Sequence, residues 1–529
     1  MSRRFARLTL IALMLLTLLP TLAGAEAYMA YINPEGFPIV NEEKTLTIMV
    51  NNSSKQPDFG EVEMWKSYER MTGVHIDWVN IPAGTASEKL NLAFVSGELP
   101  DVFLKFNISN INQYKFGSEG MLLNLNENNM LEKYAPNFYA YMKAHPSVEQ
   151  ALTFEDGSIY SLPQAVESLY NKVAAKMFFN QTWLDKVGME MPTTTDELYQ
   201  VLKAFKEQDA NGNGIDDEIP MSGPNYNYIV WALRGAFGAG NRGVHDQVVD
   251  VDPETGKARV TAASNDWKQM LEYMKMLFDE QLIDQEIFSQ KSARHIAKAS
   301  EGLYGSVIDA SITGMPSNVV GQFTGITSAF KGPDGDQYWF PIRSDLHSTG
   351  AFVITTACKT PELALKWIDY FYTDAGSKLF FYGEEGVSHV DNGDGTYSFV
   401  QSVADAEAQG LSHEQAIAAH VTAGGNNPVI YMDQYFMAED KVSLATAQAM
   451  VDYFPEIIWP IIIFTPEESD ELSVIRTDIN TYVNKMVAEF VTGKTSFDQW
   501  DNYIKQIETM GGSRMTEIYD AAMARTGLK

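Results

Sequence analysis

The alternation of apolar and polar positions predicts a regular series of strands and helices in the first part of the chain. The segment KTLTIMV (44–50) is expected to be a strand, and residues 59–73 carry apolar side chains at helical spacing before a closing glycine. The segment VHIDWVNI (74–81) alternates as a half-buried strand does. A second helix begins at a capping Thr85, and PDVFLKF (100–106) predicts a third strand. The order β-α-β-α-β is typical of a parallel sheet with crossover helices.

Further elements follow from the same patterns. Residues 194–208 place apolar side chains at positions i, i+3, i+4 and i+7, which predicts an amphipathic helix, and residues 264–283 predict a longer one. Residues 251–260 and 391–400 predict hairpins, because turn residues separate two short runs in each. Residues 303–310 read as an apolar strand. The chain therefore belongs to the α/β class.

Length and charge narrow the possible functions. The chain has 529 residues, which indicates two or three domains, and a formal net charge of −30. A phosphate backbone would repel so negative a chain, so we do not expect a nucleic-acid partner. The single cysteine, Cys358, cannot form an internal disulfide. It lies in an expected strand-to-helix turn without a basic activator, which indicates a buried thiol and not a nucleophile.

The N-terminal segment has the composition of a secretory signal peptide. Arginines at the start precede an apolar run from Leu8 to Leu19, and small residues follow. A membrane anchor is the weaker alternative, because the run is short and Pro20 interrupts it. We expect export with removal of residues 1–25; cleavage after Ala27 is the other possibility.

Motifs of common enzyme classes are missing. The segment HEQAIAAH separates His413 and His420 by seven positions, whereas a zinc-protease helix needs a second histidine where Ile417 stands. No nucleophile elbow of the G-x-S-x-G type and no phosphate-binding loop occur. The sequence therefore favours a protein that is not an enzyme.

The segment DANGNGIDDEIP (209–220) begins like a calcium-binding loop. Asp209, Asn211 and Asn213 offer side-chain oxygens at a spacing of two, which turns them toward one concave side. An EF-hand has a bidentate Glu at position 12, but this chain has Pro220, which blocks an exiting helix. A calcium-sensing helix pair is therefore not expected.

The acidic residues later in the loop favour a metal over a plain turn. Asp217 and Glu218 add carboxylates, and Ile215 adds a backbone carbonyl. These acids would repel one another without a cation, although a solvated Asn-Gly turn remains the alternative. We predict a structural Ca²⁺ with these ligands: Asp209, Asn211, Asn213, Ile215, Asp217 and Glu218.

Several segments together resemble the bacterial extracellular solute-binding proteins of ABC importers, in the carbohydrate-type group with alginate- and oligosaccharide-binding members. The resemblance rests on residues 94–103, 178–220, 361–386 and 490–511 and covers nearly all of the mature chain. It implies a two-lobed periplasmic-binding-protein fold, type II-like, in which each lobe is a sheet flanked by helices and the chain crosses between the lobes more than once. It also implies that the loop 209–220 binds calcium outside an EF-hand.

The resemblance sets the expected domains and location. We expect one lobe from residues 44–163 and 342–383, and a second lobe, with the calcium loop, from 164–341 and 384–529. Many relatives carry a lipobox whose last residue is an acylated cysteine, but Ala25 stands at that position here. We therefore expect release into the periplasm or the medium without a lipid anchor.

The function implied by the resemblance is capture of a sugar or oligosaccharide between the lobes and delivery to an ABC permease in the membrane, by a monomer. One alternative is an exported protein that presents its ligand to a sensor, and peptides or other organic solutes stay open as ligands. A secreted polysaccharide-degrading enzyme is less favoured.

Candidate ligand residues follow from the chemistry of sugars. Apolar ring faces and hydroxyls call for aromatic platforms and planar polar partners, and open α/β sheets bind ligands beyond the carboxyl ends of their strands. The candidates near such loops or near helix breakers are Trp231, Trp339, Trp459, Asp309, Asn225 and Arg343. Core burial is an equal alternative for the three tryptophans. An arginine in the cleft would favour an acidic sugar; a surface ion pair is the alternative. Trp65, Trp267 and Trp367 lie within helical periods and are expected in the core.

Overall fold

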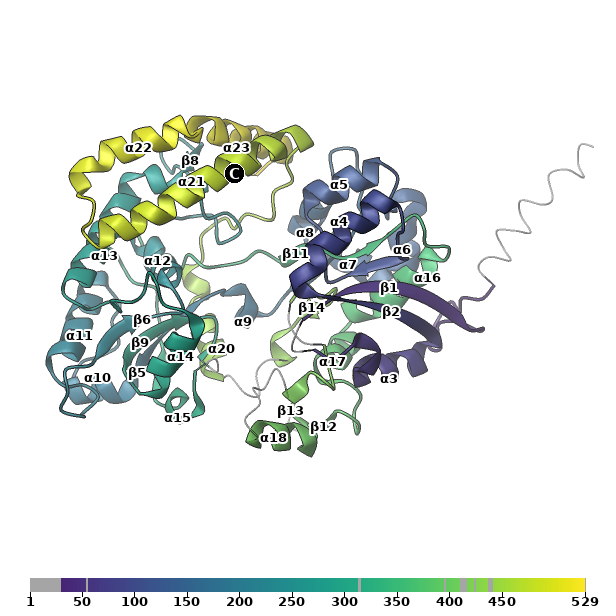
Figure 1. Cartoon of the computed structure of the whole chain (residues 1–529), viewed down its shortest axis with the longest axis horizontal. Coiled ribbons are helices and arrows are strands. Elements are labelled where there is room, and N and C mark those ends of the chain that lie inside the picture. The colour runs from purple at the N-terminus through teal and green to yellow at the C-terminus, as the bar shows by residue number, and fades with distance from the viewer. Residues whose placement is uncertain are drawn as a thin grey trace, which may run out of the picture.

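The computed structural model shows two lobes side by side, each a sheet flanked by helices (Figure 1). It describes residues 30–53, 56–312, 315–393, 396–409, 416–422, 425–435 and 441–528. The predicted signal peptide and His413 lie outside these residues. No helix within the described ranges is both long enough and apolar enough to cross a bilayer. The two-lobed α/β architecture agrees with the prediction.

The first lobe is built on a six-stranded sheet in the order β14-β4-β11-β3-β1-β2. Its strands are β1 (Lys44–Asn52), β2 (Val74–Pro82), β3 (Val102–Leu104), β4 (Leu162–Val166), β11 (Leu346–Ile354) and β14 (Ile430–Tyr431). β1 pairs in parallel with both β2 and β3, through the crossover helices α3 (Glu63–Thr72) and α4 (Ala86–Ser96). The predicted β-α-β-α-β unit is therefore confirmed. β11 inserts antiparallel between β3 and β4.

Further helices cover this sheet and close its core. They are α5 (Asn110–Ser118), α6 (Met130–Tyr134), α7 (Pro136–Ala144), α8 (Pro146–Leu152), α16 (Pro361–Asp369) and α17 (Asp374–Tyr382). The buried rings of Trp65 and Trp367 stack with centroids 5.5 Å apart, which confirms both as core residues. Cys358 is a buried free thiol, as predicted.

The second lobe has a four-stranded sheet in the order β10-β5-β9-β6. The strands are β5 (Lys176–Asn180), β6 (Ile219–Ser222), β9 (Tyr304–Asp309) and β10 (Phe323–Gly325). The surrounding helices are α10 (Gln181–Val187), α11 (Thr195–Glu207), α12 (Tyr226–Arg234), α13 (Asn265–Asp279), α14 (Ser292–Ser300), α15 (Ser317–Val320) and α20 (Lys441–Ala449). The buried Trp267 belongs to the core of this lobe, as predicted.

The C-terminal helices and two hairpins complete the molecule. Helices α21 (Pro466–Val491), α22 (Trp500–Thr509) and α23 (Gly512–Thr526) lie across the top of the second lobe (Figure 1). The predicted hairpins are present as β7 (Val249–Val251) with β8 (Ala258–Val260), and as β12 (His389–Asp391) with β13 (Tyr397–Phe399), followed by α18 (Gln401–Ala408).

The described parts of segment 384–435, which was expected in the second lobe, pack instead on the first. β14 pairs in parallel with β4, Ile430 opposite Ala165, and Ile430 belongs to the core that contains Trp367. The ring of Phe399 stacks on Tyr382 of α17 at 5.3 Å. A parallel pair between strands so far apart in sequence leaves no local pattern, so the expected boundary is corrected at this segment. The remaining boundaries stay a prediction.

Two crossing segments between the lobes pair with each other; we call residues 167–174, which contain α9 (Leu169–Lys172), and 341–346 the hinge segments. The N–H of Ala174 donates to the carbonyl of Pro341 at 2.7 Å, and the N–H of Arg343 donates to that of Lys172 at 2.8 Å. A further segment, which we call the 459–464 crossing, starts at Trp459 in the second-lobe core. Its Ile463 then packs against the first lobe.

Candidate functional site

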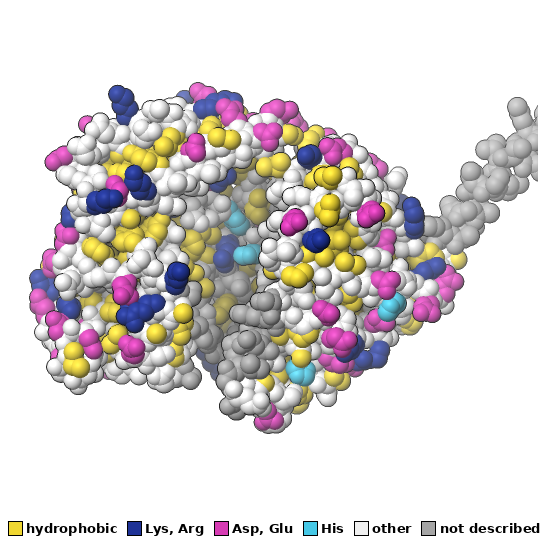
Figure 2. Space-filling model, in the orientation of Figure 1, with side chains coloured by type: hydrophobic (Ala, Val, Ile, Leu, Met, Phe, Trp, Pro, Cys, Tyr) yellow, Lys and Arg dark blue, Asp and Glu magenta, His cyan; other side chains and the backbone are white. Residues whose placement is uncertain are grey.

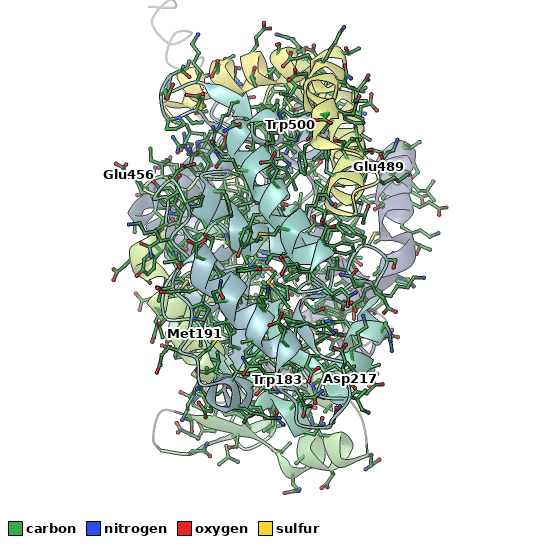
Figure 3. The ribbon with its side chains drawn as sticks, turned by 90° about the vertical axis from the view of Figure 1, so that its left-hand side faces the viewer. Trp183, Met191, Asp217, Glu456, Glu489 and Trp500 are labelled. Carbon is green, nitrogen blue, oxygen red and sulfur yellow. The ribbon has the colours of Figure 1, made fainter. Side chains whose placement is uncertain are left out.

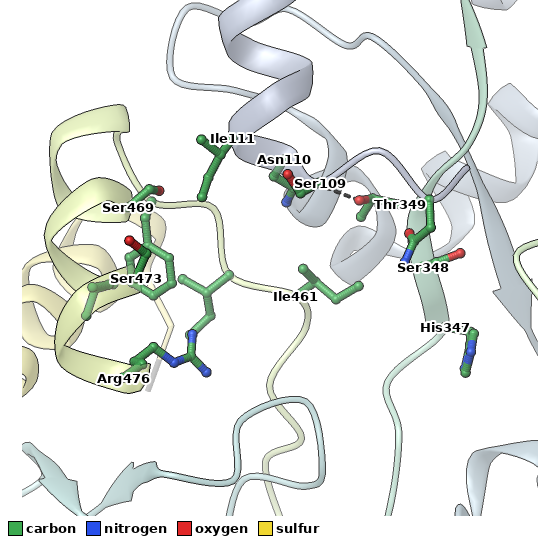
Figure 4. Close-up of a pocket in the computed structure, with 14 residues that line it drawn as sticks. Ser109, Asn110, Ile111, His347, Ser348, Thr349, Ile461, Ser469, Ser473 and Arg476 are labelled. Atoms are coloured by element: carbon green, nitrogen blue, oxygen red, sulfur yellow. Dashed lines mark hydrogen bonds between the residues drawn. The ribbon is translucent and has the colours of Figure 1, made fainter. Parts of the chain in front are cut away.

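A cavity of about 350 Å³ lies between the lobes (Figure 4). The first lobe lines it with residues from 107–111 and with 347–349 at the start of β11. The second lobe contributes residues from 469–476 of α21, and the 459–464 crossing supplies three apolar side chains. Figure 4 shows Ser469, Ser473 and Arg476 on one side and Asn110 and Thr349 on the other. Both lobes therefore contact the same space.

The first-lobe side is held rigid by hydrogen bonds behind the cavity wall. The chain turns after β3 at Asn107, whose φ is 49°, and the Ser109 hydroxyl caps the first turn of α5. The Thr349 hydroxyl donates to Asn110 Oδ1 at 2.6 Å, and Gln113 Nε2 donates to Thr349 Oγ1 at 3.3 Å. The loop after β3, at the carboxyl end of a predicted parallel strand, thus presents fixed amide and hydroxyl groups to the cavity.

The second-lobe side combines a neutralised arginine with apolar side chains. Arg476 Nη2 donates to Asp246 Oδ2 at 2.9 Å, and the Tyr519 hydroxyl binds the same carboxylate oxygen. Ile461 and Phe464 cover part of the remaining wall. Hydroxyls, amides and apolar surface in one cavity suit a small polar ligand with apolar faces.

An uncharged histidine, His347, lines this cavity. Arg343 of the hinge segments donates from Nη1 to the carbonyl of Asn171 at 2.8 Å. Burial and the charge of Arg343 lower the pKa of His347, which lines the cavity, to about 4. The same two causes lower the pKa of His245 to about 4. Figure 2 shows basic and histidine side chains inside the hollow between the lobes. Both imidazoles are uncharged at neutral pH, so the arginine carries the charge.

Two of the predicted aromatic platforms are completely buried. Trp339 is 0% exposed and its Nε1 donates to the carbonyl of Ala175 at 2.9 Å. Trp459 is also 0% exposed and stacks on Tyr519 with centroids 6.0 Å apart. Both rings thus lie in the second-lobe core, and Trp459 also lines a small cavity of about 90 Å³ next to the interlobe one, so a ligand role for the two tryptophans stays a prediction. The loops that carry them fold into the second-lobe core, which was the alternative for both.

The other candidates lie near the expected strand ends but do not line the interlobe cavity. Trp231 is half-buried, donates from Nε1 to Gln247 Oε1 at 3.0 Å, and borders a smaller cavity of about 60 Å³. Asn225 follows β6 and uses its side-chain oxygen to cap α12. Asp309 ends β9, and one of its oxygens lies 3.8 Å from His295 Nε2. A role for these three residues in ligand binding stays a prediction.

Sequence reasoning missed most of the groups that line the cavity. Ser469 and Ser473 lie one turn apart on a long helix, and nothing local in the sequence distinguishes them from other helical serines. Asn110 could have been found, because it begins α5 directly after the capping Ser109, close to the carboxyl end of the predicted strand β3.

The predicted calcium loop, residues 209–220, lies at the lower end of the second lobe, where Figure 3 labels Asp217, at the opposite end from Trp500. Its side chains converge on one another. The amides of Asn211 and Asn213 donate to Asp217 Oδ1 at 2.7 and 3.0 Å. Asp209 Oδ1 accepts a backbone N–H at 3.1 Å. Rotation of each amide about its last bond would exchange the donor nitrogen for an oxygen ligand.

One buried oxygen supports a cation in this loop. Glu218 is 4% exposed, and its Oε1 makes no hydrogen bond within the described part of the chain. A buried carboxylate oxygen without a partner is costly, and a cation would satisfy it. No three His, Cys, Asp or Glu side chains of the described residues are grouped closely enough to hold a metal, so amide and carbonyl oxygens would have to contribute. Calcium accepts such a mixed oxygen set, so the donors fit calcium.

Comparison with known proteins establishes the family. A model of the family described as bacterial extracellular solute-binding protein matches residues 49–378. The chain belongs to this family. Among the relatives of this solute-binding protein is the fructooligosaccharide ABC transporter substrate-binding protein FusA of Streptococcus pneumoniae. FusA is 30% identical over 495 residues, which cover 90% of this chain and 89% of FusA.

Solved structures agree with the fold of this solute-binding protein. FusA in complex with kestose superposes with a TM-score of 0.73 at 26% identity, over 92% of this chain and 100% of FusA. A solute-binding protein from Bifidobacterium longum infantis, described as binding HMO, gives a TM-score of 0.78 at 21% identity, with coverage of 92% and 100%. The alginate-binding protein AlgQ2, solved without calcium ion, gives 0.71 at 24% identity, with coverage of 92% and 99%. Their descriptions name binding proteins, and that of AlgQ2 points to calcium in a relative.

Proposed function

We propose that this protein is the substrate-binding component of an ABC transporter, which captures an oligosaccharide between its lobes and delivers it to a membrane permease. The observation that carries the proposal is the cavity lined from both lobes by fixed hydroxyl and amide groups beside isoleucine and phenylalanine side chains. The identity to FusA over nearly the whole chain supports the oligosaccharide class. The protein binds its ligand without chemical turnover.

Closure of the lobes provides the mechanism. A ligand in the cavity accepts and donates hydrogen bonds at Asn110 on the first lobe and at Ser473 on the second. It makes both sets of contacts only when the lobes are close, so ligand binding shifts the equilibrium toward the closed state. The paired hinge segments 167–174 and 341–346 bend as one unit during this motion.

The loop 209–220 has a structural role in this proposal. Asp209, Asp217 and Glu218, with the two asparagines and the carbonyl of Ile215, hold a calcium ion that fixes the outer part of the second lobe. Calcium supplies positive charge that offsets the repulsion of the carboxylates. In this proposal the N-terminal segment 1–25 directs export of the mature protein.

Isothermal titration calorimetry against a panel of oligosaccharides, kestose included, tests the proposal. We expect saturable binding of at least one compound and no release of reducing ends on prolonged incubation. The Asn110→Ala variant should bind about 10-fold more weakly, because a polar contact in the cavity is lost. Asn112→Ala, on the same helix but outside the cavity lining, is the matched control and should bind normally. Binding of peptides alone, or turnover of a sugar, would contradict the proposal.

A further inference from the structure

Among the described residues that line the interlobe cavity, Arg476 is the one with a permanent charge. It follows Ser469 and Ser473 at helical spacing, so one face of α21 presents all three residues to the cavity. Figure 4 shows the Arg476 side chain extending from α21 toward the space between the lobes. An unpaired arginine at this place would attract an acidic sugar, so the partner of Arg476 decides which ligands the cavity accepts.

Asp246 is that partner, and three further donors hold it in place. Arg476 Nη2 lies 2.9 Å from Asp246 Oδ2, which also accepts a hydrogen bond from the Tyr519 hydroxyl. The other oxygen, Oδ1, accepts the backbone N–H groups of Val248 and Val249 at 3.0 and 2.9 Å. The Asp246 side chain is only 8% exposed. A buried carboxylate that four donors hold is a fixed counter-charge for Arg476.

The ion pair leaves part of the arginine available to a ligand. The Arg476 side chain is 32% exposed, and its guanidinium carbon lies 5.9 Å from the centre of the Tyr519 ring. Its Nε and Nη1 groups form no hydrogen bond with the described residues. Asp246 borders a small adjoining cavity that shares Arg476, Ile461 and Phe464 with the main one. Arg476 therefore has N–H donors for a ligand, and the negative charge of Asp246 acts at close range on that ligand.

We propose that Asp246 is a specificity-determining residue of the interlobe cavity: it neutralises Arg476, so that the arginine binds uncharged sugar hydroxyls and acidic sugars are rejected. The inference rests on the proposed function and assigns the residue that selects among its ligands. A hydroxyl oxygen accepts a charge-assisted hydrogen bond from Arg476 without adding any charge. A ligand carboxylate would place a second negative charge beside Asp246 in a partly buried site, and the repulsion opposes its binding.

Calorimetry with each sugar in two charge states tests the inference. The panel consists of kestose, maltotriose, cellotriose and mannotriose, each also prepared with its primary hydroxyls oxidised to carboxylates. We expect the wild type to bind at least one uncharged trisaccharide, and to bind the oxidised form of that sugar about 10-fold or more weakly. Asp246→Asn leaves the charge of Arg476 uncompensated, so this difference should shrink to about twofold or reverse.

A second variant tests the same pair from the other side. Arg476→Gln should weaken binding of the uncharged sugar about 10-fold, because a charged donor in the cavity is lost. The charge of Asp246 is then unbalanced, so the oxidised sugar should be disfavoured at least as strongly as in the wild type. This variant decides the question where the melting curve of Asp246→Asn shows that the protein does not fold.

Controls separate a role in specificity from a structural one. Loss of a merely structural ion pair would weaken binding of both forms of the sugar alike and leave the ratio of their affinities unchanged. Glu471→Gln removes the carboxylate of an exposed ion pair with Arg514, 2.8 Å long, which starts from the same helix but lies outside the cavity lining. This variant should keep the wild-type ratio.

The outcomes distinguish the inference from the wider proposal. Equal or tighter binding of the oxidised sugar by the wild type, an unchanged ratio in a folded Asp246→Asn, or normal binding by Arg476→Gln overturns the role of Asp246 and leaves the proposed function intact. Failure of every trisaccharide to bind, in both charge states, overturns both.

Discussion

Lys172 and Asp345 form an ion pair that joins the two hinge segments, with Nζ 2.7 Å from Oδ1. The other carboxylate oxygen of Asp345 accepts a hydrogen bond from the Ser147 hydroxyl of α8 at 2.6 Å. Backbone hydrogen bonds lie on both sides of the pair, from Arg343 to Lys172 and from Val166 to Asp345. The pair therefore ties both crossing segments to each other and to the first lobe.

Removal of this contact should loosen the hinge. Asp345→Asn leaves Lys172 unpaired and should cost about 1–3 kcal/mol of stability, measured from the midpoint of urea unfolding. Burial alone would raise the pKa of Asp345, but the hydrogen bonds from Lys172 and Ser147 outweigh it and hold the pKa below its usual value. The contribution of the Asp345 carboxylate to the free energy of unfolding is therefore complete above about pH 4, and it is lost as the pH falls through the folded-state pKa of Asp345.

A surface ion pair with the same N–O distance provides the comparison for Asp345→Asn. Lys275 and Asp279 are also 2.7 Å apart, but on the exposed side of α13. Asp279→Asn should cost less than about 0.5 kcal/mol. Equal effects of the two variants would show that the hinge pair has no special role.

Calcium removal should destabilise the protein without any sugar present. A ligand that binds only the folded state at 100 times its Kd contributes about 2.7 kcal/mol, so EDTA should lower the melting temperature by several degrees. Asp217→Ala should abolish this response. Asp216→Ala is the matched control, because Asp216 pairs with Lys206 and is not among the predicted ligands, and this variant should respond as the wild type does. Identical melting curves of the wild type with calcium and with EDTA would contradict the calcium site.

Mild acid should lower the free energy of unfolding through His245, which lies in the hollow between the lobes. Burial, Arg343 and His347 lower the pKa of His245 to about 4, below its unfolded value of about 6.5. The unfolded chain therefore binds the proton first, and stability falls as the pH drops from about 6.5 to about 4. The effect should reach roughly 2–3 kcal/mol.

The difference between the wild type and His245→Gln isolates this group, because other titrating residues contribute equally to both proteins. Unfolding midpoints of both at pH 7, 5.5 and 4.5 give that difference. A difference that does not change with pH would rule out the lowered pKa.

Trp339 should contribute to stability and not to affinity. Trp339→Phe loses the hydrogen bond to the carbonyl of Ala175 and leaves unfilled space in the core, at a cost of roughly 1–3 kcal/mol. The Kd for the ligand found by calorimetry should stay within about twofold. A large loss of affinity with unchanged melting temperature would return Trp339 to the ligand site.

The helices and strands that could be predicted are those set by residues close to one another in the sequence. Leu46, Ile48 and Val50 alternate along β1 and are all 0% exposed, so the pattern alone identified the strand and its buried face. The pairing of β14 with β4 could not be predicted, because Ile430 and Ala165 are distant in sequence and the contact depends on the assembled lobe.

The site was predictable only where a loop follows a predictable strand. The loop after β3 and Asn110, which begins α5, follow from the strand order, whereas Ser473 reaches the cavity only because α21 of the second lobe also contacts α5 of the first lobe. The sequence suggested an exposed position for Trp459, because Pro460 beside it is typical of an exposed turn. Here the crossing carries the ring into the core against Tyr519 instead.

The 459–464 crossing gives the molecule a property that separate lobes and a separate pocket would not have. It is anchored in the second-lobe core by Trp459 and in the first lobe by Ile463, while Ile461 and Phe464 line the cavity between. The 459–464 crossing is thus both a connection between the lobes and part of the cavity wall. The same few residues therefore affect both which ligand binds and how easily the lobes open. A substitution in this crossing that changes the preferred ligand should also change the rate at which the lobes open.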